Sequence, residues 1–160
     1  MSEHQQDVDR VWALMKKIGF CMLSTRVDDD IRARPMAAHV VPEDNTVYFL
    51  TDVDSDKDSQ IEANPSVSLA FADASANKYV AATGRAVVSN DRAKIHELWT
   101  TSAKAWWDNA DDPQIRVMKV SLADAQYWDS PGTIVSTIKM LTAAISDQRP
   151  DMGRSAKVNL

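Results

Sequence analysis

Apolar residues near the start of the chain recur at intervals of three and four positions, the spacing that gives a helix one apolar face. These helical positions are Val8, Val11, Trp12, Met15 and Ile18. Gly19 follows them, and glycine suits the left-handed position just past a helix end. The same spacing returns near the other end of the chain at Ile134, Ile138, Leu141 and Ile145. The pattern therefore predicts one amphipathic helix over residues 8–18 and another over residues 134–145.

Between these two helices, short runs rich in β-branched and aromatic residues alternate with turn residues, which predicts strands. The six predicted strands are residues 20–26, 31–41, 47–51, 67–72, 79–89 and 115–120, the last continuing toward Trp128. Two further helices are predicted between strands. One ends before Asn64-Pro65, because the residue preceding proline disfavours helix. The other runs through Trp99 and can be capped by Asn90 or Asp91.

The order of these elements predicts a mainly β fold with some α, a six-stranded antiparallel β-barrel with peripheral helices. Closing the sheet removes exposed strand edges. Because side chains fill so small a barrel, a flat ligand has to bind outside it or between two subunits. We expect a single domain over residues 1–146, followed by a polar and flexible tail at residues 147–160.

Composition narrows the class of protein. The chain has 160 residues, of which 44% are hydrophobic and 26% charged, as expected of one globular domain rather than a disordered chain. No apolar run approaches the ~20 residues of a membrane-spanning helix. Residues 1–10 are polar and show no secretory signal, and the single cysteine, Cys21, fits a reducing cytoplasm. A net charge of −5 argues against a nucleic-acid partner.

Two arginines form the first candidate site. Arg32 and Arg34 are two positions apart on a predicted strand, so their side chains point to the same face. Adjacent guanidiniums repel each other unless an anion lies between them, and the planar guanidinium suits a phosphate. For an isolated Arg-x-Arg, salt bridges on a solvated face are the more common explanation.

The segment from Thr51 to Lys57 forms the second candidate site. A strand ends at Thr51 and a helix begins near Ser55, and helix N-termini bind anions through their free N–H groups. Lys57 adds a positive charge. Four aspartates interrupt the segment and would repel phosphate unless they point away: Asp52, Asp54, Asp56 and Asp58. A calcium loop starting at Asp52 fails, because lysine stands where that loop needs glycine and Ala63 where it needs glutamate.

Aromatic residues crowd the last third of the chain and form the third candidate. They are Trp99, Trp106, Trp107, Tyr127 and Trp128. Packing in the core or at a dimer interface accounts for most of them. The adjacent Trp106 and Trp107 face different directions, which leaves one free to meet a ligand or partner. No histidine has a second ligand at a familiar metal spacing, so no metal site is predicted.

These segments together resemble a known family. The run Thr51-x-x-x-Ser55-x-Lys57, followed by QIEANPxVSLxF over residues 60–71, resembles the pyridoxamine 5′-phosphate oxidase-like family of FMN-binding split barrels. The RARPM segment at residues 32–36 and Gly84-Arg85-Ala86 also match. The helix around residues 94–99 and the AxYWD ending at residues 125–129 resemble the general stress protein 26-like branch. The resemblance covers roughly residues 10–130.

The resemblance implies an FMN molecule at the interface of a homodimer. Arg32 or Arg34 would hold its phosphate together with Lys57, while Thr51 and Ser55 would donate hydrogen bonds. Other residues would lie along the isoalloxazine ring, and Tyr79 stands where the oxidases proper have a glutamine that reaches the flavin. The implied cofactor-binding residues are Arg32, Arg34, Pro35, Met36, Leu50, Thr51, Ser55, Lys57 and Tyr79.

The resulting hypothesis is a cytoplasmic, homodimeric FMN-dependent oxidoreductase that acts on a small molecule and is linked to stress response. The tail contains Arg149 and Arg154 but no histidine, and the oxidases proper use an arginine and a histidine there to grip pyridoxal phosphate. We therefore do not expect vitamin B6 oxidation. Three alternatives stay open: a non-catalytic flavin carrier or sensor, a relative that binds haem through His39 or deazaflavin F420, and a dimeric interaction protein whose barrel binds nothing.

Overall fold

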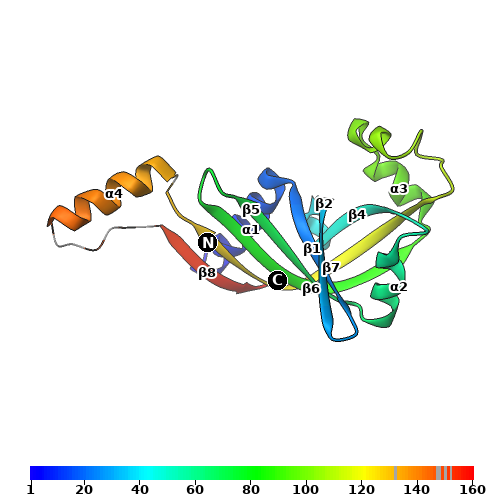
Figure 1. Ribbon diagram of the computed structural model, residues 1–160, viewed down its shortest axis with the longest axis horizontal. Coiled ribbons are helices and arrows are strands. Elements are labelled where there is room, and N and C mark those ends of the chain that lie inside the picture. The colour runs from blue at the N-terminus through cyan, green and yellow to red at the C-terminus, as the bar shows by residue number, and fades with distance from the viewer. Residues whose placement is uncertain (132, 147–148, 150, 152) are drawn as a thin grey trace.

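The computed structural model describes residues 1–131, 133–146, 149, 151 and 153–160 (Figure 1). Its helices are α1 (Glu3–Ile18), α2 (Asp56–Ala63), α3 (Arg92–Leu98) and α4 (Thr133–Ser146), with 3-10 turns η1 (Pro42–Asp44) and η2 (Thr101–Ala105). Its strands are β1 (Phe20–Val27), β2 (Asp30–Ala37), β3 (His39–Val41), β4 (Thr46–Asp52), β5 (Ser66–Asp73), β6 (Lys78–Ser89), β7 (Ile115–Asp129) and β8 (Arg154–Asn159).

The helix ends follow the capping residues of the sequence. Helix α1 begins where the Ser2 hydroxyl accepts a hydrogen bond from the Gln5 backbone N–H at 3.2 Å. It ends at Gly19, whose φ of 76° is the left-handed conformation that glycine adopts without strain. Helix α3 is capped by Asp91, which accepts a hydrogen bond from the backbone N–H of Lys94. The predicted stop at Gly19 and the predicted Asp91 cap are thus confirmed.

The strands form one antiparallel sheet in the order β2-β1-β5-β6-β7-β4-β3, with β8 added to β7. Strands β2 and β3 lie at opposite ends of this order, yet Ala38 alone separates them in the chain. The two ends of the sheet must therefore meet, so the sheet curls into a barrel. Within the described residues no hydrogen-bonded ladder joins β2 to β3 or β4, which leaves the barrel split along that line.

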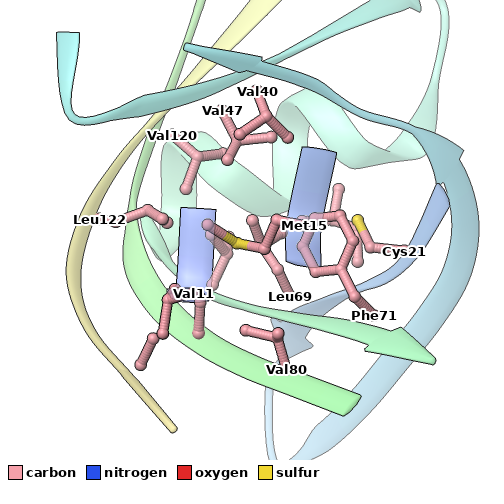
Figure 2. Close-up of a cluster of buried hydrophobic side chains, with 14 of the residues drawn as sticks. Val11, Met15, Cys21, Val40, Val47, Leu69, Phe71, Val80, Val120 and Leu122 are labelled. Carbon is pink, nitrogen blue, oxygen red and sulfur yellow. The ribbon is translucent and has the colours of Figure 1, made fainter. Parts of the chain in front are cut away.

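The main core fills the inside of the barrel (Figure 2). Val11 and Met15 of α1 contact this core, and both are fully buried. Alternate residues of the strands point inward, as in β5, where Val67, Leu69 and Phe71 are buried between exposed or half-buried neighbours. Burying a side chain of this size stabilises the fold by about 1.5–3 kcal/mol.

A smaller second core lies on the outer face of β4 and β7. There α3 contributes Ile95 and Leu98, which pack against Tyr48, Ile115 and Val117. Trp99, Trp107 and Leu50 lie against the same cluster and are partly buried. This cluster attaches α3 and the segment that follows it to one side of the split in the barrel.

The β+α fold with a mostly antiparallel sheet is confirmed, but the predicted number of six strands is wrong. The predicted strand over residues 31–41 is two strands, because the chain passes at Ala38 from one end of the sheet to the other. The predicted loose tail is wrong for residues 154–159, which form β8. Val158 on this strand is buried and pairs with Ala125 of β7. Residues 147, 148, 150 and 152 of that predicted tail lie outside the described residues.

Helix α4 stands apart from the barrel in Figure 1, between the end of β7 and the start of β8. Its side chains Met140, Leu141 and Ile145 are exposed. In the part of the chain that the structure describes, no helix combines the length and the apolar character needed to cross a bilayer.

Candidate functional site

A pocket of about 440 Å³ lies across the split in the barrel. Strands β2 and β4 form its two sides, the start of α2 lies at one end and the η2 segment covers it. This volume falls in the ~300–1,000 Å³ range of small-molecule sites. The pocket thus occupies the place where the sheet leaves two edges without a common ladder.

Arg34 forms the positive end of the pocket. Its Nη2 atom donates a hydrogen bond to the Oε1 atom of Gln60 at 2.9 Å, and the same oxygen accepts a hydrogen bond from Thr25 Oγ1 at 2.7 Å. Its Nη1 atom is buried and has no hydrogen-bond partner among the described residues. A buried donor without a partner costs about 1–3 kcal/mol, so this atom is poised to bind an acceptor from a ligand.

A second cation reinforces this end. Lys57 is half-buried at the start of α2, and its pKa is lowered first by burial and then by the positive charge of Arg34. The pKa of Arg34 is likewise lowered by burial, although Asp56 opposes that shift. Two neighbouring cations that are partly removed from water repel each other, and an anion placed between them would offset the repulsion. The chemistry of this end fits a phosphate or carboxylate.

Two hydroxyls lie next to the cations. Thr51 is buried and lines the pocket, and its Oγ1 atom is 3.2 Å from Ser55 Oγ. Ser55 does not itself line the pocket, because its hydroxyl donates a hydrogen bond to Asp58 Oδ1 at 3.1 Å. The structure therefore places Thr51 in the lining of the pocket and Ser55 behind it.

The aspartates of this segment turn away from the pocket only in part, because the charges of Asp52, Asp56 and Asp58 all act on Lys57. Asp54 and Asp56 are exposed. Asp52 does line the pocket, but its Oδ2 atom accepts a hydrogen bond from Trp107 Nε1 at 3.3 Å and its Oδ1 atom one from the Asp54 backbone N–H. The Asp52 carboxylate therefore fixes the wall of the pocket.

The opposite wall is apolar and aromatic. Both tryptophans line the pocket, but Trp107 also packs against the second core, whereas 80% of the surface of Trp106 is exposed. One member of the pair is thus packed and the other exposed, as predicted, although both face the pocket. His39 also lines this wall, and burial lowers its pKa, so its imidazole is neutral at pH 7.

The pocket brings together six of the nine residues that the sequence predicted for a cofactor. These are Arg34, Pro35, Met36, Leu50, Thr51 and Lys57. Ser55 contacts Thr51 from behind. Arg32 lies two residues before Arg34 on the same face of β2, is exposed and does not line the pocket. Tyr79 lies on β6 beside Trp128 of β7, on the outer surface and outside this pocket.

The sequence did not identify the wall contributed by Thr100, Ser102 and Ala103. These residues come from a short 3-10 turn whose sequence carries no periodic pattern, and the nearby tryptophans were the single available signal. Arg92 holds the loop that follows them, because its guanidinium donates hydrogen bonds to the backbone carbonyls of Ala110, Asp112 and Ile115.

Outside the pocket, the described residues offer neither a metal site nor a reactive cysteine. They contain no group of three or more histidine, cysteine, aspartate or glutamate side chains that could hold a metal ion. Cys21 is buried, and burial raises its pKa to about 12, so its thiol stays protonated. A protonated thiol is a poor nucleophile.

Comparison with known families gives a match over most of the chain. Residues 6–151 match the model of the family described as pyridoxamine 5′-phosphate oxidase like. No curated protein matches the sequence.

Several solved structures share the fold. A candidate general stress protein 26 from Jannaschia sp. CCS1 is 23% identical with a TM-score of 0.80, and the match covers 97% of this chain and 99% of that one. General stress protein 26 from Bacillus anthracis is 24% identical with a TM-score of 0.71, covering 79% and 95%. A general stress FMN/FAD binding protein from Xanthomonas citri is 22% identical with a TM-score of 0.69, covering 78% and 89%.

Proposed function

The chain belongs to the pyridoxamine 5′-phosphate oxidase-like family, and on that premise we propose that it is a homodimeric flavoprotein that binds FMN. The observation that carries the proposal is Arg34 Nη1, a buried donor with no partner among the described residues, next to the half-buried Lys57. The name of the Xanthomonas citri neighbour, an FMN/FAD binding protein, supports a flavin as the ligand.

Arg34 and Lys57 would bind the phosphate, with Thr51 beside them in the lining of the pocket. Arg34 Nη1 and Lys57 Nζ supply charged donors, whereas the Thr51 hydroxyl already donates to Ser55, because the Ser55 proton goes to Asp58. Hydrogen bonds to a charged group contribute about 1.5–3 kcal/mol each. Because Gln60 already accepts a hydrogen bond from Arg34 Nη2, the guanidinium is held in place before the ligand arrives.

Pro35, Met36 and Leu50 would lie along the ring system on the apolar side of the pocket. Trp107, fixed by its hydrogen bond to Asp52, closes that side and excludes water. When bound, the flavin supplies hydride and single-electron transfer, and the protein supplies position and electrostatics. We propose on this ground an oxidoreductase acting on a small molecule. Two neighbours named as general stress proteins support a role in stress response.

A second copy of the chain would complete the site. Large apolar side chains on the outer face of the sheet are exposed, among them Phe20 at the rim of the pocket, Met22, Tyr79 and Trp128. Since Tyr79 does not line the pocket of its own chain, any contact that it makes with a flavin has to be in the pocket of a partner. Covering this face with its copy would bury these side chains.

An absorption spectrum of the freshly purified protein tests the proposal most simply. We expect the two visible and near-ultraviolet bands of oxidised flavin, and FMN itself on release by denaturation. Titration of the apoprotein with FMN provides the second arm. Absence of flavin in the purified protein together with no binding at high micromolar FMN would refute the proposal.

Replacing Lys57 with alanine should weaken FMN binding about tenfold to a hundredfold, the equivalent of one charged hydrogen bond. Folding should be affected less, because the lysine is already disfavoured by burial and by Arg34. Lys16→Ala is the matched control, since Lys16 is exposed on α1 and does not line the pocket. If Lys57→Ala and Lys16→Ala bind FMN alike, the assignment of Lys57 to the phosphate is wrong.

One observation favours a second cofactor class. His39 lines the same pocket and is neutral, the form in which imidazole binds a haem iron. The same spectrum distinguishes the two, because haem gives an intense Soret band that flavin lacks. A His39→Ala protein that keeps all of its cofactor would exclude haem. Reduction of the bound flavin by NADPH, followed by turnover with an acceptor, would exclude a passive carrier.

A further inference from the structure

The guanidinium of Arg34 is bonded to the rest of the chain at one place, the side-chain amide of Gln60 on α2. Arg34 Nη2 donates a hydrogen bond to Gln60 Oε1 at 2.9 Å. Among the described residues, no other group accepts a hydrogen bond from this guanidinium, and no carboxylate forms a salt bridge with it. Gln60 is half-buried and does not itself line the pocket. It therefore contacts the residue proposed to hold the phosphate without contacting the ligand.

Thr25 of β1 fixes the orientation of this amide. The Thr25 side chain is buried, and its Oγ1 atom donates a hydrogen bond to the same Gln60 oxygen at 2.7 Å. Because guanidinium N–H groups can only donate, the Gln60 atom that lies between Arg34 and Thr25 has to be the oxygen and not the amide nitrogen. An amide oxygen has two lone pairs, and both are used here. The Gln60 amide therefore has one orientation, set by a residue of the neighbouring strand.

These two hydrogen bonds also position the unpaired nitrogen of Arg34. The guanidinium is planar and rigid, so holding Nη2 restricts where Nη1 can lie. Nη1 is buried and has no partner among the described residues. The Arg34 side chain thus loses its conformational freedom when the protein folds rather than when a ligand binds, which favours affinity. Gln60 and Thr25 together prepare a donor for an acceptor that the chain does not supply.

The contact to Arg34 is uncharged, although the same segment carries four aspartates. They are Asp52, Asp54, Asp56 and Asp58. A glutamate has the length of a glutamine, so Gln60→Glu would keep an oxygen at the position of Oε1 and add a full negative charge. Carboxylate–arginine pairs are frequently bidentate, so the second oxygen could also accept a hydrogen bond from Arg34 Nη1. A carboxylate at this position would therefore use both the charge and the free nitrogen that an anionic ligand needs.

We propose that Gln60 determines the specificity of the pocket for a phosphorylated ligand, as a positioning residue that acts through Arg34. It holds the guanidinium with a neutral amide, so the charge and the Nη1 atom of Arg34 stay available to an anion. The proposal rests on the proposed flavin function, with FMN as the phosphorylated ligand and riboflavin as its counterpart without phosphate. No covalent step is involved.

Two substitutions of Gln60 separate its charge from its hydrogen bond. Gln60→Glu adds the charge, and Gln60→Met removes the acceptor at a similar length without charge. Both should leave α2 a helix, since the three residue types have similar helix propensities. Gln6→Glu is the matched control, because Gln6 is exposed on α1 and does not line the pocket. Gln60→Met is also made in the Arg34→Ala background, and each apoprotein is titrated by calorimetry with FMN and with riboflavin.

We expect Gln60→Glu to lose about tenfold to a hundredfold of the parent's preference for FMN over riboflavin, the equivalent of one charged hydrogen bond. Riboflavin affinity should stay within about twofold of the parent, well below the tenfold change that 1.4 kcal/mol produces. Gln60→Met should lose about threefold to tenfold of the preference, the equivalent of one neutral hydrogen bond. In the Arg34→Ala background Gln60→Met should cause no further loss, and Gln6→Glu should bind both ligands like the parent.

Three outcomes would overturn the proposal. The first is an equal loss of FMN and riboflavin affinity in Gln60→Glu, which is the result of a purely structural role. The second is a preference for FMN that Gln60→Glu leaves unchanged. The third is a loss in Gln60→Met that is the same with and without Arg34. In all three the parent still binds FMN, and the proposed flavin function stands, whereas a parent that binds neither flavin refutes the proposed function as well.

Discussion

Arg34 shows how a residue that binds a ligand can lower the stability of the ligand-free protein. Its guanidinium is partly withdrawn from water, lies near Arg32 and Lys57, and leaves Nη1 without a partner among the described residues. Each of these features is unfavourable in the ligand-free protein, and each is relieved by an anion. This combination is expected where a site is kept for a ligand rather than for the fold.

Replacing Arg34 with leucine should therefore stabilise the ligand-free protein while abolishing tight FMN binding. The lost hydrogen bond to Gln60 is worth about 1 kcal/mol, whereas the unpaired donor costs about 1–3 kcal/mol. A net gain of about 1 kcal/mol raises the melting temperature of a domain of this size by about 2–4 °C. Arg26→Leu is the matched control and should not raise it. A clear fall in the melting temperature of Arg34→Leu would contradict this account of the residue.

The sequence predicted correctly to which face these side chains point, but not which of them contact the pocket. The alternation rule correctly puts Arg32 and Arg34 on one face of β2. The rule does not predict which of the two arginines contacts α2, because that depends on how β2 is positioned relative to the helix. In the structure Arg34 makes the contact, through Gln60. Ser55 shows the same limit, since its hydroxyl turns to Asp58 rather than to the pocket.

At the scale of elements, a charged cluster joins α1, β7 and β8. Asp7 of α1 is nearly buried, accepts a hydrogen bond from the Tyr127 hydroxyl at 2.6 Å and another from Arg154 Nη2 at 3.0 Å. Glu3 also pairs with Arg154. These contacts fix the last strand against the first helix, so the two ends of the chain hold each other in place.

This cluster gives a pH-dependent prediction. The hydrogen bond from Tyr127 and then that from Arg154 lower the pKa of Asp7 below its ordinary value of 3.8. A carboxyl group with a lowered pKa in the folded state stabilises the fold above its unfolded pKa, and this contribution is lost as the pH falls through the folded value.

Asp7→Asn should therefore be less stable than the parent at pH 7, and the difference should shrink as the pH falls below about 3.8. Urea unfolding at a series of pH values measures it. Asp9→Asn is the control, because Asp9 is exposed on the same helix. A difference between Asp7→Asn and the parent that is constant from pH 7 to pH 3 would show that the charge of Asp7 is not what stabilises the contact.

Strand β8 marks the limit of prediction at this scale. Its sequence RSAKVN has Ala156 and Val158 as the apolar members of its alternation, too short a pattern to separate it from a polar tail. What makes it a strand is the free edge of β7 and the anchoring of Arg154 by Asp7, both of which come from distant parts of the chain. Capping residues and helix periodicity are local signals, so the existence of the helices was predicted correctly, although α1 begins at Glu3 rather than at residue 8.

At the scale of the whole molecule, part of the outer face of the sheet presents an uncharged surface. Met22 of β1 lies beside Ala70 of β5, which lies beside Ala81 of β6, and Ala72, Tyr79 and Trp128 form the next row. Exposed apolar patches of this kind mark interaction sites. The proposed homodimer would cover this face.

Met22→Glu should then dissociate the dimer, because an interface over this face would bury a carboxylate without a partner, and burying an unpaired charge costs several kcal/mol. Light scattering coupled to size-exclusion chromatography measures the mass, and FMN affinity should fall with it. Met140→Glu on α4 is the matched control, since Met140 is similarly exposed and lies off the sheet. If Met22→Glu stays dimeric, this face is not the interface.

The overall architecture was predictable because the strand runs and turns are local, and because a small antiparallel sheet has few ways to remove its edges. The strand pattern did not predict the position of the split between β2 and β4. The split arises because the chain passes at Ala38 from one end of the sheet to the other. The η2 segment lies at the pocket because its neighbours Trp99 and Trp107 pack against the second core. The sequence pattern does not reveal this second core.

The central claim is that Arg34 holds the phosphate of a flavin, and four dissociation constants test it most directly. Calorimetric titration compares FMN with riboflavin, which lacks the phosphate, on the parent and on Arg34→Ala. We predict that the parent prefers FMN and that Arg34→Ala loses about tenfold to a hundredfold of that preference, with riboflavin binding nearly unchanged. An equal loss for both ligands, or an unchanged preference for FMN, would contradict the claim.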